Sequence, residues 1–400
     1  MGFYYRLGEI PHKRHTQFRQ PDGTLYAEQL VGTLGFNGVS SLLYHLQPPT
    51  RIARISTPVP YGAKPLKDRP LAPTHLKTLA QEITGPDYLA ARKTMLLNSD
   101  VSISICNPSE KDTSYYYKNA QADEVVFVHE GSGELHSQMG SVPFRAGDYL
   151  VIPRTVIHRF QFTNDEAVRL LIIESFSPVE TPRRYRNHFG QLLEHSPYCE
   201  RDIRPPSTLI TDHGTGEYHV QIKKEGFLHQ YFYNHSPFDV VGWDGYFYPY
   251  AFSIHDFEPI TGRIHQPPPI HQTFEGHNFV ICSFVPRLFD YHPLSIPAPY
   301  NHSNVDSDEV LYYVAGNFMS RKGIDLASFT IHPGGIPHGP HPGTVEDSIG
   351  KKETHELAVM IDTFKPLYLT EEALPLMDEN YPMSWQESTG SPPRAADLMD

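Results

Sequence analysis

Two stretches of the 400-residue sequence, DEVVFVHEG at 123–131 and DEVLYYVAG at 308–316, share one pattern. Each opens with Asp-Glu-Val, continues as a run of strand-forming residues and ends at a glycine seven residues after the glutamate. Further along, each copy has a strand-like segment that runs into a proline, and a histidine follows five residues later, at His158 and His338. We interpret this repeat as one β-hairpin scaffold that is present twice.

The regions around both copies are also strand-like. Between about 96 and 175, and again between about 218 and 370, short apolar runs are separated by glycine turns, which is typical of a sandwich or barrel. A jelly roll of two Greek keys supplies such a framework, and cupins belong to that class. The sequence therefore predicts an all-β bicupin, two jelly-roll β-barrel domains with few short helices. Only 74–83 and 86–97 look helical or mixed.

The length favours two domains. We place an N-terminal β-rich domain at 1–210, with a cupin core at about 96–175 that holds no metal. A catalytic cupin domain is expected at 211–385. The small, polar residues of 386–400 predict a disordered tail.

Composition excludes several classes of protein. The formal net charge of −13 argues against a nucleic-acid partner, because an acidic surface repels phosphate backbones. No apolar run is long enough to cross a membrane. The three cysteines form no CxxC pair, which suits a reducing compartment. We therefore expect a cytoplasmic protein with no membrane or nucleic-acid partner.

The second copy carries candidate metal ligands. His302 precedes Glu309 by seven residues, and the partner hairpin returns His338. At the mouth of a cupin barrel these three would form a 2-His-1-carboxylate triad, which leaves positions on Fe(II) open for an organic substrate and O2. Asp306 and Asp308 are rival carboxylates, but Glu309 stands at the same place in its strand as its counterpart in the first copy.

The first copy does not repeat this ligand set. It retains Glu124 and His158, but Tyr117 stands where the second copy has His302. We therefore expect the first barrel to be structural and free of metal.

Other histidines surround the triad. His265 and His271 flank three prolines, and a stiff loop beside a metal suits a general base. From the spacing alone, surface loop residues are the favoured interpretation. His332 could orient the ligands or the substrate. No role follows for His271, His277, His292, His341 and His355.

Several longer motifs resemble one family. They are YYRLGEIPHKRHTQFRQPDGTLYAEQL at 4–30, GFNGVSSLLYH at 35–45, HQPPPIHQTF at 265–274, PYNHSNVDSDEV at 299–310 and IPHGPHPG at 336–343. In these motifs the chain resembles the homogentisate 1,2-dioxygenases, in their shorter bacterial form, over nearly its whole length.

The resemblance implies a function. It implies an Fe(II) enzyme that cleaves the ring of homogentisate with O2 to give maleylacetoacetate, in tyrosine and phenylalanine catabolism. It implies iron ligands at His302, Glu309 and His338 and a catalytic base at His265. A substrate pocket is implied at Tyr300, Phe318, His332 and His338. It also implies a homo-oligomer, a trimer or hexamer. We expect homogentisate to chelate Fe(II) through its carboxylate and ortho phenolate.

One departure leaves alternatives open. Phe318 stands where the family has a substrate-contacting tyrosine, and a phenyl ring cannot hydrogen-bond a ring hydroxyl or carboxylate. A gentisate- or hydroquinone-type dioxygenase on the same scaffold is therefore the close alternative. A zinc-type cupin isomerase would need a fourth protein ligand, and Asn304 stands in that place. A non-catalytic bicupin that binds a metal or ligand is the alternative from another class.

Overall fold

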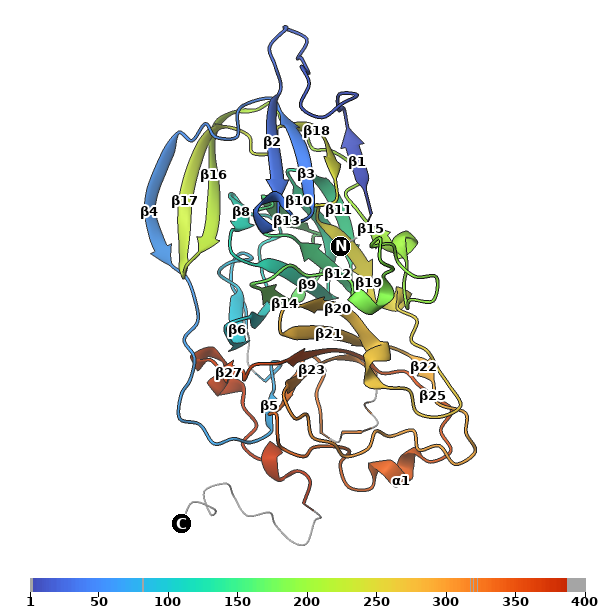
Figure 1. Cartoon of the computed structure of the whole chain (residues 1–400). Helices are drawn as coiled ribbons and strands as arrows, with labels where there is room; N and C mark the ends of the chain where they lie inside the picture. The colour runs from blue at the N-terminus through green and yellow to red at the C-terminus, as the bar shows by residue number, and fades with distance from the viewer. Residues whose placement is uncertain (1–2, 81–82, 317, 319, 322, 387–400) are drawn as a thin grey trace. The chain divides into compact units, whose positions relative to one another are not determined.

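The structure is a computed structural model that describes residues 3–80, 83–316, 318, 320–321 and 323–386 (Figure 1). The chain forms two compact units. The first takes in residues 1–62, 84–93 and 103–253, and the second takes in residues 63–83, 94–102 and 254–400. The tail expected at 386–400 lies, apart from its first residue, outside the described part of the chain.

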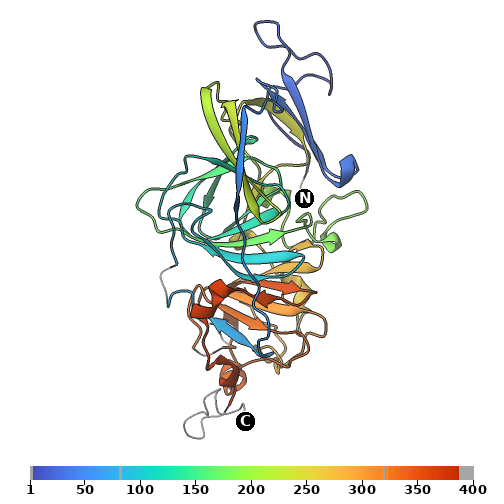
Figure 2. The ribbon, with the colours of Figure 1, turned by 90° about the vertical axis from the view of Figure 1, so that its left-hand side faces the viewer.

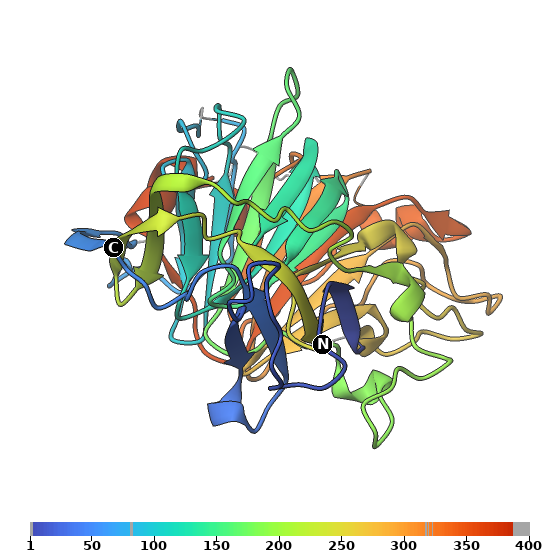
Figure 3. The same cartoon turned by 90° about the horizontal axis from the view of Figure 1, so that it is seen from above.

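The first unit is built from β-sheets. One sheet, seen from above in Figure 3, has the order β1 (Tyr5–Gly8), β18 (Val240–Gly245), β3 (Ser40–His45), β2 (Ala27–Gly32). A second has the order β11 (Gly140–Arg145), β10 (Ser132–Ser137), β13 (His158–Phe162), β8 (Tyr116–Asn119), β16 (Thr215–Lys224), β17 (Phe227–His235), β4 (Arg54–Pro60). A third contains β15 (Ile203–Arg204), β19 (Tyr250–Ser253), β12 (Asp148–Ile152), β9 (Asp123–Glu130), β14 (Arg169–Ser175), β7 (Val101–Cys106).

The second unit is centred on one antiparallel sheet. Its order is β20 (Gln272–Gly276), β21 (Phe279–Phe284), β26 (Leu357–Thr363), β23 (Asp308–Ala315), β24 (Phe329–His332), β5 (Thr74–Leu76). Figure 2 shows the blue β5 alongside the orange strands, although it comes from far earlier in the chain. Two small pairings complete the unit: β22 (Arg287–Leu288) with β25 (Glu353–Thr354), and β27 (Tyr368–Leu369) with the end of β6 (Arg92–Leu97).

Helices are few and short. Within the described residues there is one α-helix, α1 (Thr344–Ser348). The remaining helical turns are of the 3-10 type: η1 (Leu34–Phe36), η2 (Arg183–Tyr185), η3 (Glu200–Asp202), η4 (Ile254–Asp256), η5 (Pro268–His271), η6 (Glu371–Leu376), η7 (Tyr381–Met383). The expected class, an all-β bicupin with few short helices, is confirmed. None of the described helices has the length and apolar character that a membrane crossing requires.

The two segments expected to be helical or mixed are corrected by the structure. Residues 74–76 form β5 and residues 92–97 form β6. Both strands are largely buried and pair with distant strands, β5 with β24 and β6 with β27. Pairing with a sheet therefore outweighs the local preference of these residues.

The repeated Asp-Glu-Val stretches occupy equivalent places. β9 lies between β12 and β14, and β23 lies between β24 and β26. Glu124 faces Ile152 and Glu174 across its neighbours, while Glu309 faces His332 and Asp362. Because both strands have neighbours on each side, their apolar residues are buried as near-continuous runs.

The boundary between the units differs from the expected one. We expected the second domain to begin at 211, but the first unit continues to residue 253. The reason lies in strand pairing, since β16 runs parallel to β8 and β17 pairs with β4. Residues 215–235 therefore complete a sheet of the first unit.

Candidate metal centre and its cavity

The three expected ligands come from β23 and from two loops that face each other. Glu309 is the second residue of β23. His302 and His338 form an isolated bridge in which each backbone N–H donates to the other residue's carbonyl oxygen at 2.8 Å. Residues that are opposite in such a bridge place their side chains on one face, and the two ring centroids lie 4.3 Å apart.

The ligand atoms converge. The Nε2 of His302 lies 3.7 Å from Oε2 of Glu309, and the Nε2 of His338 lies 3.5 Å from Oε1. One ligand atom from each residue lies within 4.8 Å of the other two. The geometry is therefore compatible with three ligands to one shared ion.

Both imidazoles are oriented as metal ligands usually are. The Nδ1 of His302 donates to the carbonyl oxygen of Tyr300, and the Nδ1 of His338 donates to that of Ile336, each at 3.2 Å. This leaves both Nε2 lone pairs directed towards Glu309. The Nε2 of His338 is buried without a hydrogen-bond partner. A divalent cation would satisfy this orphaned atom, so the residues present fit a metal.

The site holds one ionised carboxylate. Burial alone would raise the pKa of Glu309, but the three histidines that face its carboxylate, His302, His332 and His338, outweigh burial and hold it well below its usual range. The Glu309 carboxylate beside it in turn raises the pKa of His302. Burial, followed by the nearby Glu309, raises the pKa of Asp362 to about 8. Glu309 is thus the charged acid of the pair at neutral pH.

The rival carboxylates have other positions. Asp308 accepts backbone N–H groups from Gly334 and Leu367, both at 2.7 Å. Asp306 is exposed. Neither belongs to the group of converging ligand atoms, so Glu309 remains the candidate ligand.

His332 lies behind the ligands rather than in the substrate pocket. It is fully buried and, like His338, is not among the residues that line the cavity described below, so the expected contact of these two histidines with substrate stays a prediction. Its Nδ1 donates to Oε1 of Glu309 at 2.8 Å, and the Tyr381 hydroxyl donates to its Nε2 at 3.2 Å. Burial lowers its pKa to about 4, so the ring is neutral at pH 7. His332 therefore orients Glu309.

A cavity of about 200 Å³ opens beside Glu309 and His302. Its apolar wall includes Phe284, Leu311, Tyr313, Phe318, Ala358 and Met360. Its polar wall includes His265, His271, Arg287, Tyr300, Ser320, Arg321 and Glu356. Cavities of this kind, mostly apolar with a few convergent polar groups, are typical ligand sites.

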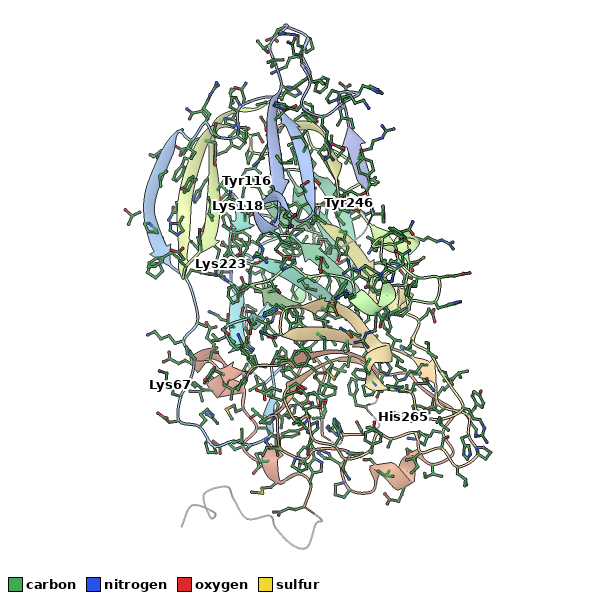
Figure 4. All side chains as sticks on the ribbon, viewed as in Figure 1. Lys67, Tyr116, Lys118, Lys223, Tyr246 and His265 are labelled. Atoms are coloured by element: carbon green, nitrogen blue, oxygen red, sulfur yellow. The ribbon has the colours of Figure 1, made fainter. Side chains whose placement is uncertain are left out.

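Three further expected residues lie in the cavity wall. His265, labelled in Figure 4, comes from the loop before η5, and its Nδ1 lies 3.7 Å from Oδ2 of Asp290. Its ring centroid is 5.2 Å from that of Tyr300, which is 58 % exposed. Phe318 is buried, with its ring edge-on to Tyr313 at 4.4 Å between centroids. The structure places His265, Tyr300 and Phe318 in the wall of the same cavity that His302 and Glu309 line.

The histidines without an assigned role occupy different places. His271 lines the cavity, and burial lowers its pKa to about 3. His341 is buried and its Nε2 lies 3.1 Å from the Ser384 hydroxyl. His277, His292 and His355 do not line this cavity.

Other site residues were not foreseen from the sequence. Arg321, Arg287 and Glu356 line the cavity. Tyr381 contacts His332 from the C-terminal part of the chain, and the Trp385 indole donates to the carbonyl oxygen of Gly339 at 3.0 Å. None of these residues stands at a regular spacing from the ligands, so no local pattern identifies them.

The corresponding place in the first unit is filled by a side chain. Tyr117 and His158 pair across β8 and β13 as His302 and His338 do. Arg92 extends its guanidinium to Glu124 at 2.8 Å and to Glu174 at 3.0 Å. Burial opposes ionisation of Glu124, but Arg92 outweighs it and holds the pKa of that carboxyl below its usual range. The Arg92 guanidinium thus neutralises Glu124. At the equivalent position of the second unit, Glu309 faces two histidines instead.

Comparison with known proteins identifies relatives of the whole chain. The family model for the N-terminal part of homogentisate 1,2-dioxygenase matches residues 7–254. A Saccharolobus solfataricus protein named "Putative dioxygenase" is 43% identical over 390 residues, which cover 97% of this chain and 100% of that protein. A homogentisate 1,2-dioxygenase of Legionella pneumophila (strain Lens) is 26% identical over 402 residues, covering 94% of this chain and 90% of that enzyme.

Solved structures resemble the chain more loosely. A structure of Bacillus subtilis oxalate decarboxylase aligns with a TM-score of 0.36 and 12% identity, over 78% of this chain and 84% of that one.

Proposed function

This chain belongs to the homogentisate 1,2-dioxygenase family, and we propose that it is an Fe(II)-dependent enzyme that cleaves homogentisate with O2 to maleylacetoacetate. The observation that carries the proposal is the convergence of His302, Glu309 and His338 beside an apolar cavity. When bound there, Fe(II) would supply the redox chemistry and the open coordination positions that an ionised phenol and O2 need.

The protein's own residues would hold and orient the reactants. His302 and His338 would bind the metal through Nε2, while Glu309, kept ionised and fixed by His332, would bind through its carboxylate. Phe318, Leu311 and the rest of the apolar wall would exclude water from the ring.

His265 is the candidate base. The Asp290 carboxylate, 3.7 Å from Nδ1, favours the tautomer with its proton on Nδ1. This leaves Nε2 as the nitrogen that would accept the phenolic proton. His265 lines the same cavity as His302 and Glu309, so a phenol bound there would share the cavity with both the base and the metal ligands.

The proposal is tested by oxygen uptake. We expect the chelated protein to regain activity with Fe(II) and not with Zn(II), and to consume one O2 per homogentisate. Homogentisate, gentisate and hydroquinone should be compared at equal concentrations. Equal or faster uptake with gentisate or hydroquinone would overturn the substrate assignment. Absence of uptake with all three would favour the non-catalytic binding protein.

Phe318 supports the second candidate, a gentisate- or hydroquinone-type dioxygenase. Its ring lies in the cavity wall and offers no hydrogen-bond donor for the ring substituents of homogentisate. The substrate comparison above therefore decides between the two candidates.

A second expected result concerns His265. We expect His265→Ala to retain its iron but to lose about 10²- to 10³-fold in kcat, because a positioned base contributes on that order. The measurement is iron content together with oxygen-uptake kinetics. His355→Ala is the matched control, since His355 is exposed and does not line the cavity. Unchanged turnover in His265→Ala would assign the base to another residue.

A further inference from the structure

The cavity wall contains a positive charge to which the proposed function assigns no role. Arg321 lines the cavity together with His302 and Glu309. We propose that Arg321 is the receptor for the substrate's carboxylate, so that the site selects phenolic acids over neutral phenols. The inference rests on the proposed function and assigns the acid group a protein partner, where the sequence alone predicted only the metal.

The guanidinium is fixed beside the ligands. Its Nη1 donates to the carbonyl oxygens of Gly339, the residue after His338, and of Ser320. The Trp385 ring lies 5.7 Å from the guanidinium carbon, and the Tyr381 hydroxyl is a further hydrogen-bond neighbour. A guanidinium that is already held in place loses little conformational freedom when it binds a carboxylate.

Part of the guanidinium has no partner. The Nε of Arg321 is buried without a hydrogen bond. A buried donor of this kind costs free energy until an acceptor reaches it. A carboxylate suits this donor well, because arginine presents its N–H groups as a planar fork that matches two oxygens.

Charge balance distinguishes Arg321 from the other cavity arginine. Arg287 lies 3.6 Å from the carboxylate of Glu356, which also lines the cavity, so that pair is close to neutral. No carboxylate of the described residues forms an ion pair with Arg321, whose hydrogen-bond acceptors are neutral.

A divalent metal is only partly neutralised by Glu309. The cavity would therefore hold two positive charges in excess, one from the metal centre and one from Arg321. A substrate with a carboxylate and an ionised phenol would balance both. In a mostly apolar cavity such pairing is stronger than it would be in water.

Binding measurements without turnover test the inference. We would titrate the Fe(II) protein without oxygen with 4-hydroxyphenylacetate and with 4-hydroxyphenylacetamide, which lacks the charge. We expect Arg321→Gln to weaken binding of the acid about 10- to 100-fold and to leave the amide within about twofold, since a hydrogen bond to a charged group is lost only for the acid. Arg321→Lys should retain part of the preference.

The controls separate a receptor from a structural residue. Arg263→Gln removes an exposed charge of the same unit and should leave both affinities unchanged. Equal weakening of acid and amide in Arg321→Gln, or no weakening of either, would overturn the inference. Acid binding that depends on the metal but not on Arg321 would place the carboxylate on the metal instead, and would also overturn it.

The proposed function fails by a different result. If no aromatic acid supports oxygen uptake but the acid preference still depends on Arg321, the dioxygenase assignment is wrong and the carboxylate receptor stands.

Discussion

His338→Ala is expected to bind no measurable iron and to show no oxygen uptake above background. Its Nε2 is buried, has no hydrogen-bond partner and lies 3.5 Å from the Glu309 carboxylate, so alanine removes a ligand that no neighbouring group replaces. Loss of a group that merely orients a ligand costs about 10- to 100-fold in metal affinity. We therefore expect more than about 100-fold here, measured as iron retained after reconstitution and desalting.

His302→Ala should behave in the same way, because its Nε2 approaches the other oxygen of Glu309. His332→Gln is the informative comparison. It removes an imidazole that contacts Glu309 but is not among the converging ligands, so a partial loss of iron is expected. Full iron content in His338→Ala would contradict the metal site as we describe it.

Arg92→Met is expected to destabilise the first unit by about 3–5 kcal/mol, the range found when one partner of a buried ion pair is removed. The side chain of Arg92 is 2% exposed and forms ion pairs with Glu124 and Glu174, whose side chains are 1% and 4% exposed. Without Arg92, Lys223 of β16, labelled in Figure 4, still pairs with Glu174 at 2.6 Å, but the side chains that donate to Glu124, among them Tyr88 and Tyr117, are uncharged. The measurement is the free energy of unfolding from urea denaturation.

Two variants control this measurement. Lys224→Met removes an exposed charge from β16, the strand that also carries Lys223, and should change the free energy of unfolding by no more than about 0.5 kcal/mol. Arg92→Met combined with Glu124→Gln should recover part of the loss, because the carboxylate that remains, Glu174, still has Lys223 as its partner. A single variant as stable as the wild type would mean that Arg92 does not neutralise these acids.

The candidate ligands could be predicted because they are tied to a repeated strand. Glu124 and Glu309 stand at the same place in two copies of one stretch, and each strand lies between two neighbours in its sheet. A strand's register decides which side chains share a face. The spacing of His302 and His338 from this strand therefore predicted that their side chains lie together with that of Glu309. The structure brings these two residues together with Glu309.

Other parts could not be predicted because they depend on contacts between distant segments. β5 joins β24 across some 250 residues of chain, and β16 and β17 complete a sheet of the first unit. The local helical preference of residues 74–83 does not predict that they pair with the edge of a sheet formed by distant strands. The position of the boundary between the units follows from those pairings.

The amino-acid sequence by itself determined the strand-rich class, the duplicated scaffold and the three residues that converge on one point, because these follow from local alternation and spacing. Only the tertiary structure decided that His332 fixes Glu309 from behind, that Arg92 fills the equivalent place in the first unit, and that Arg321 and Tyr381 stand close to the ligands. Those positions depend on which surfaces pack together after folding, and the spacing of residues along the chain does not determine that packing.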